Sequence, residues 1–244
     1  MREMNMITEP IQTRRALLTW QRPLEQNGPP RRRFAVAELV KCGEGLGFSY
    51  KNDSEFALAS EAGFEGYPGL ALGGKHESST ATDVLKRRLP PRNRPDFKEF
   101  MERFGLWPEA HFSILSLLAY TGARLSSDGF GISETFDGFD RPFRYIFDIA
   151  GYRHYSEGLL GLAEKEPVLF RHEPTNPDDP HAVEVIRQNG ARVGYVNRMQ
   201  TGPVLRWLTH GKIDACVFRL NGRSVYPRLF IMADIVPNCR RTPV

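Results

Sequence analysis

The sequence lacks the features that mark membrane-spanning, secreted and redox-active proteins. No apolar run approaches the roughly 20 residues that a membrane-spanning helix needs. The opening residues, MREMNMITEP, contain no apolar stretch of the kind that a signal peptide needs. The three cysteines, Cys42, Cys216 and Cys239, lie too far apart to form a CxxC metal or redox pair. We therefore expect a cytoplasmic protein with no membrane partner, whose thiols are reduced and behave as small buried hydrophobic groups.

The composition indicates a globular protein rich in turns and strands. Hydrophobic residues make up 41% of the 244 residues, which is enough for a core, and the length suits one large domain or two small ones. The 22 glycines, 18 prolines and 16 phenylalanines favour substantial β structure over a helical bundle. We expect a fold of the α+β class.

The N-terminal half carries both strand and helix signals. Its polar first 33 residues, which end in GPPRRRF, indicate an exposed loop, and residues 34–72 carry short apolar runs typical of strands. The small polar stretch GGKHESSTAT indicates another loop. The segment PDFKEFMERFG has apolar residues at helical spacing and predicts a helix, and a second helix is expected over about residues 109–121. This half should therefore form a mixed α/β domain.

The C-terminal half predicts a small barrel. The turn-rich, acidic segment 133–142 suggests a domain boundary, so that the domains are 1–140 and 141–244. Beyond it, one helix is evident, PVLRWLTH, which begins at Pro203. Six strand candidates follow one another with short spacers, and QNG between the third and fourth is a strong hairpin signal. The candidates are RYIFDIAGYRHY, EPVLFRHE, AVEVIRQ, ARVGYVN, IDACVFRLNG and YPRLFIMADI. Six short strands with one helix suggest an OB-like, closed or nearly closed six-stranded β-barrel.

The positive charge is concentrated in the C-terminal part. Residues 1–150 carry 20 basic and 20 acidic side chains, whereas residues 151–244 carry 13 basic and 9 acidic ones, and 11 of those 13 are arginine. Arginine presents a planar fork of donors that matches phosphate oxygens. The excess favours a nucleic-acid partner, although an excess of this size also occurs on ordinary protein surfaces.

Three motifs resemble sites of phosphate or metal chemistry but lack essential parts. GLALGGKH nearly matches a phosphate-binding loop, but His76 replaces the required Ser or Thr. PDDPHAVEV places Asp178 near Glu184, as in a metal-dependent nuclease, without the catalytic lysine. The histidines match no metal-ligand spacing; they are His154, His172 and His181. We therefore expect no cofactor, no metal and no enzymatic activity, with a metal-dependent nuclease as the weakest alternative.

Four ordered motifs resemble the HIRAN domain, over about residues 147–236. They are GYRHY, LFRHEPTNPDDPHAVEV, VGYVNR and YPRLFIMADI. The central one follows the pattern R-x-P-x-N-P-x-D-x-x-A-[VI]-x-V, with one extra residue between Arg171 and Pro174. HIRAN domains occur in helicase-like transcription factors and as free-standing bacterial proteins. The resemblance implies an OB-like barrel that binds single-stranded DNA, notably a free 3′-hydroxyl end, in a role such as DNA repair or defence.

The same resemblance implies which residues meet the DNA. Asn176 and Asp179 take the positions that meet the terminal nucleotide, where a carboxylate can accept a bond from a 3′-hydroxyl and repels a 3′-phosphate. Arg153 takes the basic position on the first strand and can meet phosphate.

The stacking positions of the family are altered in this sequence. His154 and Asp178 stand where family members have two aromatic residues that sandwich a base. The resemblance leaves His154 as a DNA-binding residue that can still stack weakly, whereas Asp178 cannot stack. Tyr155 and Tyr195 are left as stacking residues, and a barrel-core position for Tyr155 is equally compatible with the sequence. We therefore expect weaker or altered end binding. A purely turn-forming role for Asn176 and Asp179 is the alternative.

The N-terminal half bears a fainter resemblance to the N-terminal subdomain of HipA-type toxin kinases. It rests on PPRNRPDFKEFMERFGL, FSILSLLAYTGARLSSDGFGI and the earlier FSY and PGLAL. No kinase lobe is present, so the resemblance implies a regulatory module with a protein partner; an unrelated α+β domain is the alternative. The main hypothesis is thus a non-enzymatic DNA-binding protein. The competing hypothesis is a HipA-like toxin–antitoxin regulatory protein with weak or no DNA binding.

Overall fold

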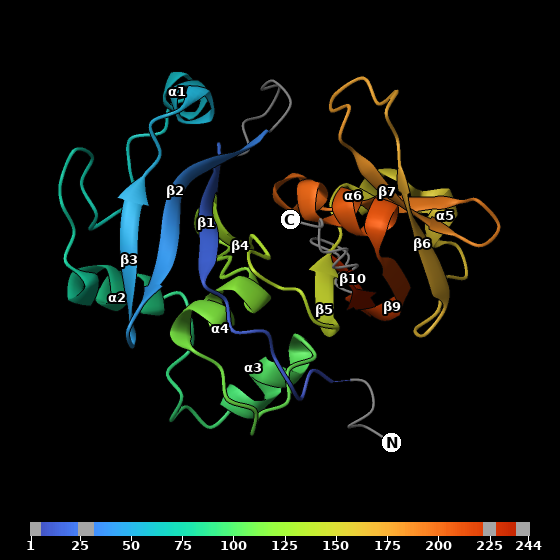
Figure 1. Cartoon of the computed structure of the whole chain (residues 1–244), viewed down its shortest axis with the longest axis horizontal. Coiled ribbons are helices and arrows are strands. Elements are labelled where there is room, and N and C mark those ends of the chain that lie inside the picture. Colours follow the sequence, from blue (N-terminus) through green and yellow to red (C-terminus); the bar gives the residue numbers. More distant parts are fainter. Residues whose placement is uncertain (1–5, 24–31, 222–227, 238–244) are drawn as a thin grey trace, which may run out of the picture. The chain divides into compact units, whose positions relative to one another are not determined.

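The computed structural model describes residues 6–23, 32–221 and 228–237 (Figure 1). The chain separates into two compact units. We call residues 12–104 with 111–137 the sheet unit, and residues 1–11, 105–110 and 138–244 the barrel unit. Independent domains over 1–140 and 141–244 stay a prediction.

The sheet unit is built on a four-stranded antiparallel sheet with the order β3-β2-β1-β4 (Figure 1). Its strands are β1 (Arg15–Gln21), β2 (Arg33–Cys42), β3 (Gly45–Tyr50) and β4 (Phe130–Glu134). In β1 the side chains of Ala16, Leu18 and Trp20 are buried at the period of two that a strand requires. The expectation of an exposed loop over residues 1–33 was therefore wrong, because a central strand lies within that segment.

Four helices belong to the sheet unit: α1 (Ser54–Glu61), α2 (Ser78–Lys86), α3 (Phe97–Arg103) and α4 (Ile114–Thr121). The helix in PDFKEFMERFG is confirmed. The second predicted helix begins later than residue 109, because Ser113 caps it by accepting a bond from the Ser116 amide at 3.1 Å. Helix α1 lies where strands were expected, and α2 where a loop was expected. Both helices bury few side chains, so apolar spacing gave little signal.

The barrel unit contains a six-stranded antiparallel sheet with the order β5-β10-β9-β6-β7-β8. All six predicted strands are confirmed, and QNG forms the predicted β7–β8 hairpin. The strands are β5 (Phe143–Asp148), β6 (Pro167–His172), β7 (Val183–Arg187), β8 (Arg192–Tyr195), β9 (Lys212–Asn221) and β10 (Arg228–Val236). The ends of the sheet meet where Ala150 pairs with Tyr195, through two backbone hydrogen bonds of 2.8 and 2.9 Å. The predicted OB-like barrel architecture is thus present.

Barrel closure requires a glycine at position 194. Gly194 has a φ of +148°, a conformation that side chains disfavour. A Cβ there would lie 2.5 Å from Ile149 Cγ2 and 2.7 Å from the Ala150 carbonyl oxygen. Both distances are shorter than van der Waals contact allows, so the glycine of VGYVNR permits β8 to approach the segment after β5.

Helix α6 (Thr201–His210) confirms the predicted helix and extends it by two residues at its start. The barrel unit also has a short helix, α5 (Ser156–Leu159), and two 3₁₀ turns, η2 (Tyr152–His154) and η3 (Arg198–Gln200), which the sequence did not suggest. No helix in the described ranges is long and apolar enough to cross a membrane.

Two cysteines differ from the expected buried hydrophobic groups. Cys42 is exposed and Cys216 is only partly buried, whereas Cys239 lies outside the described residues. Both described thiols lie near strand surfaces rather than in the cores, so their hydrophobicity does not drive folding.

A carboxyl group is buried at the end of β4. Glu134 is fully buried, accepts hydrogen bonds from the Thr135 and Phe136 amides at 3.0 Å each, and accepts another from the Thr13 hydroxyl. Phe136 has a φ of +58°, so this carboxyl group helps to hold a turn that is unfavourable for a side-chain-bearing residue. Burial raises the pKa of Glu134 from 4.5 to about 7, although its donors oppose the shift.

The raised pKa of Glu134 predicts a pH-dependent stability. Folding takes up a proton here between pH 4.5 and about 7, so the free energy of unfolding should fall as the pH rises through that window. The fall attributable to Glu134 should approach about 3 kcal/mol and should be absent in Glu134→Gln. Urea unfolding from pH 5 to 8, with amide exchange of β1 and β4, measures it. Equal pH slopes in the two proteins would contradict the assignment.

Candidate nucleic-acid interface

The turn between β6 and β7 is organised around Asn176. Its Oδ1 accepts hydrogen bonds from the Asp178 and Asp179 amides at 3.0 and 3.1 Å, in the local pattern that favours Asn in turns. Its Nδ2 donates to Glu173 Oε2 at 2.7 Å and to the Tyr195 hydroxyl at 3.2 Å. The side-chain amide therefore has its main hydrogen-bonding capacity engaged within the protein.

Asp179 keeps one carboxylate oxygen that no hydrogen bond in the turn occupies. Its Oδ1 accepts from the His181 amide at 2.9 Å, whereas Oδ2 faces Arg198 Nε at 3.7 Å, which is an ion-pair contact rather than a hydrogen bond. The side chain is partly exposed. Asp179 can thus accept a hydrogen bond from a ligand while the turn stays intact.

Two tyrosines and an arginine lie beside this turn. The rings of Tyr155 and Tyr195 meet edge to face with centroids 5.9 Å apart. The guanidinium carbon of Arg192 lies 5.6 Å from the Tyr155 centroid and 5.1 Å from the Tyr195 centroid. Both rings are partly exposed, and Tyr155 follows a 3₁₀ turn rather than lying in a barrel strand. The structure thus brings together two of the predicted stacking residues.

Two carboxylates that the sequence analysis did not select hold this arrangement together. Glu173 accepts from the Tyr195 hydroxyl and from Arg192 Nη2, each at 2.6 Å, in addition to Asn176. Glu184 is buried and accepts from Arg171 Nε at 2.5 Å and from Arg192 Nε at 2.6 Å. Two features of the sequence could have pointed to these carboxylates. One is the charged residue Glu184 inside the apolar run AVEV, and the other is the extra residue between Arg171 and Pro174.

The network also sets the ionisation of its members. Hydrogen bonds from Tyr195, Asn176 and Arg192 hold the pKa of Glu173 below its ordinary value. Burial and the hydrogen bond to Glu173 raise the pKa of Tyr195 well above its ordinary value. Burial alone would lower the pKa of Arg192, but hydrogen bonds to Glu184 and Tyr155 raise it. At neutral pH Glu173 is therefore a carboxylate, Tyr195 a neutral phenol and Arg192 a guanidinium.

Arg153 and His154 lie outside the strand on which the sequence analysis placed them. They belong to the 3₁₀ turn that follows Gly151, whose φ is +70°, because β5 ends at Asp148. Both side chains are exposed, and among the described residues Arg153 forms no ion pair. Arg153 is thus a cation available to a phosphate, carried by a turn instead of a strand.

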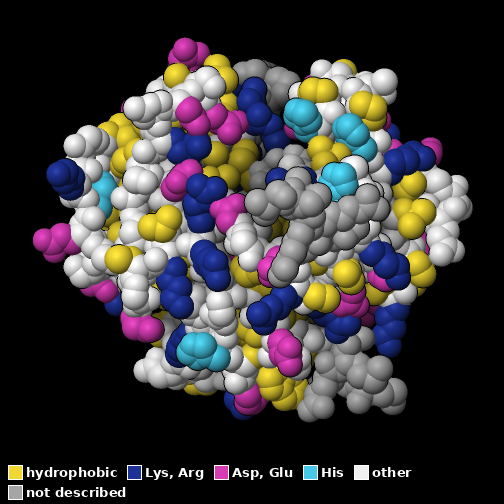
Figure 2. Space-filling model, in the orientation of Figure 1, with side chains coloured by type: hydrophobic (Ala, Val, Ile, Leu, Met, Phe, Trp, Pro, Cys, Tyr) yellow, Lys and Arg dark blue, Asp and Glu magenta, His cyan; other side chains and the backbone are white. Residues whose placement is uncertain are grey.

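Most of the other arginines that the structure describes in the barrel unit have carboxylate partners. Examples are Arg144 with Asp234 at 2.7 Å, Arg187 with Glu166 at 2.6 Å and Arg228 with Asp148 at 2.8 Å. Figure 2 shows the same pattern on the face that it draws, where basic and acidic side chains are interspersed. Ion pairs with acids thus engage several of the arginines that were counted toward a phosphate-binding surface.

The structure gives little support to the motifs that resembled phosphate-binding, nuclease and metal sites. The GLALGGKH segment is a loop with no strand directly before it. His172 contacts the Pro180 carbonyl oxygen at 2.9 Å, and the His181 amide bonds Asp179. Within the described ranges, no three or more His, Cys, Asp or Glu side chains are grouped so that they could hold a metal ion.

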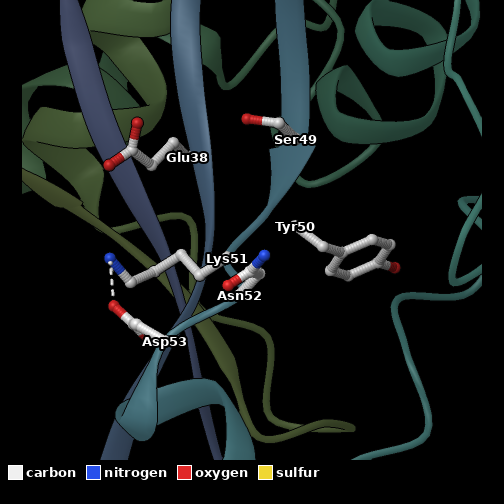
Figure 3. A pocket seen from close by; sticks show the side chains of 6 residues that line it. All are labelled: Glu38, Ser49, Tyr50, Lys51, Asn52 and Asp53. Atoms are coloured by element: carbon white, nitrogen blue, oxygen red, sulfur yellow. Dashed lines mark ion pairs between the residues drawn. The ribbon is translucent and has the colours of Figure 1, made fainter.

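A polar hollow lies on the sheet unit, apart from the predicted site residues (Figure 3). It is lined by Glu38, Ser49, Tyr50, Lys51, Asn52 and Asp53. Lys51 Nζ pairs with Asp53 Oδ2 at 2.9 Å, and the Tyr50 ring points away from this pair (Figure 3). The hollow is open, and its one lysine is neutralised by a neighbouring acid.

Loss of charge at Glu184 should destabilise the barrel unit more than the same change at Glu166. The Glu184 side chain is 3% exposed and contacts two arginines, whereas that of Glu166 is 23% exposed and contacts one. Glu184→Gln weakens two charged hydrogen bonds to a buried carboxylate, so it should cost about 3 kcal/mol. Glu166→Gln should cost less, because its carboxylate is more exposed and solvent screens its ion pair. Urea unfolding of the two full-length variants measures the difference, and equal costs would show that Glu184 is dispensable.

Comparisons with known proteins assign the barrel. Residues 142–236 match the family model of the HIRAN domain. The HIRAN domain of human HLTF is similar at 21% identity, with a TM-score of 0.33 over 38% of this chain and 76% of that chain. A protein from Lactobacillus plantarum is similar at 20% identity, with a TM-score of 0.32 over 38% of this chain and 97% of that chain. No curated protein matches the chain, and the likeness of the sheet unit to HipA-type kinases stays a prediction. Residues 142–236 of this chain are a HIRAN domain.

Proposed function

We propose that the protein is a non-enzymatic DNA-binding protein whose HIRAN domain binds single-stranded DNA at a free 3′-hydroxyl end. HIRAN domains occur in DNA-binding proteins, and this supports the broader role. The observation that carries the finer proposal is the available Oδ2 of Asp179, in the same small region as Tyr155 and Tyr195.

Asp179 has the chemistry to distinguish a hydroxyl end from a phosphorylated end. A carboxylate accepts a hydrogen bond from a hydroxyl group and repels a phosphate at the same position. The neighbouring Arg198, at 3.7 Å from Oδ2, partly offsets the cost of bringing this carboxylate near the DNA backbone. Selection of the 3′-hydroxyl end then depends on Oδ2 alone, because the turn holds Oδ1 through the hydrogen bond from the His181 amide.

Asn176 acts on the DNA through the turn that it shapes. Its amide engages two backbone amides, Glu173 and Tyr195, so a base contact would require breaking one of these bonds. We assign Asn176 the role of holding Asp179 in place, which combines the two roles that the sequence left open.

Stacking and phosphate contacts supply the remaining affinity. Tyr155 and Tyr195 offer ring surface to the last bases, and base–aromatic stacking contributes about 1–3 kcal/mol per base. Arg153 offers an exposed charge to a phosphate. Because His154 and Asp178 replace aromatic residues of the family, and both are exposed, we expect a single-stranded end to be held more weakly than by two enclosing rings.

A second candidate function is a regulatory protein with weak or no DNA binding, whose sheet unit contacts a protein partner. The paired arginines of the barrel unit favour it, because ion pairs with acids reduce the charge that phosphates would meet. Salt-independent or undetectable binding of single strands would favour this candidate over the first.

Asp179→Ala should reduce the preference for a 3′-hydroxyl over a 3′-phosphate more than it reduces affinity for the hydroxyl end. The change removes a charged hydrogen bond, worth about tenfold or more in affinity, and also relieves repulsion of the phosphate. Asp179→Asn keeps an acceptor for the His181 amide but places an NH2 group where Oδ2 lies, so it should lose both the repulsion and the charged hydrogen bond without shortening the side chain. Fluorescence anisotropy with matched oligonucleotides measures both affinities.

Arg153→Ala is the matched control for this experiment. It should weaken both ends alike and make the salt dependence shallower by about 0.7 in log–log slope, because one phosphate contact is lost. An unchanged hydroxyl-to-phosphate ratio in folded Asp179→Ala would reduce Asp179 to a turn-forming residue.

A further inference from the structure

We infer that Glu173 is a positioning residue that couples base stacking to recognition of the 3′ end. The inference rests on the proposed function, since it concerns how the two parts of that site act together. It assigns a role to a carboxylate that makes no proposed contact with DNA.

Glu173 contacts both halves of the proposed site. Its Oε2 accepts from the Tyr195 hydroxyl at 2.6 Å and from Asn176 Nδ2 at 2.7 Å, and its Oε1 accepts from Arg192 Nη2 at 2.6 Å. Tyr195 and Arg192 belong to β8, and Arg192 lies over both tyrosine rings. Asn176 belongs to the turn. One carboxylate group thus joins the stacking residues to the turn by three hydrogen bonds.

From Asn176 the connection continues to Asp179, the residue proposed to meet the 3′ end of the DNA. Asn176 Oδ1 accepts from the Asp179 amide at 3.1 Å and from the Asp178 amide at 3.0 Å, so the position of the amide group fixes the backbone that carries the Asp179 carboxylate. The backbone of Glu173 also closes the turn, since its amide donates to the Ala182 carbonyl at 2.9 Å. A shift of Tyr195 on base stacking is therefore transmitted to Asp179 through Glu173.

No neighbouring carboxylate has the same set of contacts. Glu184 holds Arg192 and Arg171 but bonds neither Tyr195 nor Asn176 in the hydrogen bonds of the described residues. If Glu173 loses its charge, Arg192 keeps its bond to Glu184 and the barrel keeps its buried pair. The rings and the turn then remain folded but their link is weakened, because the single Gln oxygen can serve either Arg192 or the pair of Tyr195 and Asn176, and an NH2 donor faces the other.

A cycle of four single-stranded oligonucleotides tests the coupling directly. The oligonucleotides carry a terminal base or an abasic terminal sugar, each with a 3′-hydroxyl or a 3′-hydrogen. In the wild-type protein, loss of the hydroxyl should weaken binding about tenfold with the base present and about twofold without it. The coupling factor is the ratio of these two effects. It is then about fivefold, which is in the range found for groups that share one hydrogen-bond network.

Three variants isolate Glu173. Glu173→Gln should reduce the coupling factor to nearly one, and Tyr195→Phe, which keeps the ring and removes the hydroxyl, should do the same. Glu166→Gln is the matched control, because Glu166 also accepts two bonds from an arginine of the barrel, Arg187, away from the turn. It should leave the coupling factor at the wild-type value. General destabilisation would lower all four affinities without changing their ratio.

The outcomes separate the inference from the proposed function. A wild-type coupling factor of one with a clear hydroxyl preference would overturn the role of Glu173 and leave the proposed function standing. A fivefold factor that survives Glu173→Gln in a folded protein, or is lost equally in Glu166→Gln, would overturn it as well. Failure of the wild-type protein to bind any of the four oligonucleotides would overturn the proposed function and the inference together.

Discussion

The candidate site depends on the two backbone hydrogen bonds between Ala150 and Tyr195 that close the barrel. They join the end of the β5 segment to β8. The 3₁₀ turn η2, which begins two residues after Ala150, is thereby held beside β8, and Tyr155 reaches Tyr195 and Arg192. The approach is possible because Gly194 has no Cβ. A purely structural requirement of the barrel thus explains why the aromatic residues of two distant motifs meet.

Charge in this region is balanced before any ligand binds. Arg171 and Arg192 are matched by Glu173 and Glu184, and Asp179 has Arg198 nearby. Such a site has little net attraction for a long phosphate backbone, and the proposed function therefore assigns its contribution to affinity to hydrogen bonds and ring contacts at short range. This arrangement suits the reading of an end better than the non-specific binding of a strand.

The sequence predicted the barrel well and the sheet unit poorly. Strands such as AVEVIRQ and ARVGYVN carry apolar alternation and an Asn-Gly turn, and these local signals coincide with the final fold. Strand β1 has polar residues on both sides, and its apolar residues become buried only through pairing with β2 and β4. Helices α1 and α2 bury one and two side chains, so their apolar period is weak.

Prediction of the site was limited by long-range partners. Asn176, Asp179, Tyr155 and Tyr195 were found through ordered motifs, and the structure brings them together. Glu173 resembled an ordinary surface acid because its partners on β8 lie far along the chain. Glu184 was weighed only as part of a nuclease-like motif, because its two arginine partners, which make its burial favourable, could not be foreseen from the sequence.

The location of binding tests the account most directly. A single-stranded oligonucleotide with a free 3′-hydroxyl can be titrated into the isotope-labelled full-length protein while backbone amide resonances are followed. The account predicts that the largest shifts fall in residues 151–155, 173–182 and 192–198, at one common dissociation constant. Shifts confined to the sheet unit, or no shift at oligonucleotide concentrations that saturate other DNA-binding barrels, would contradict it.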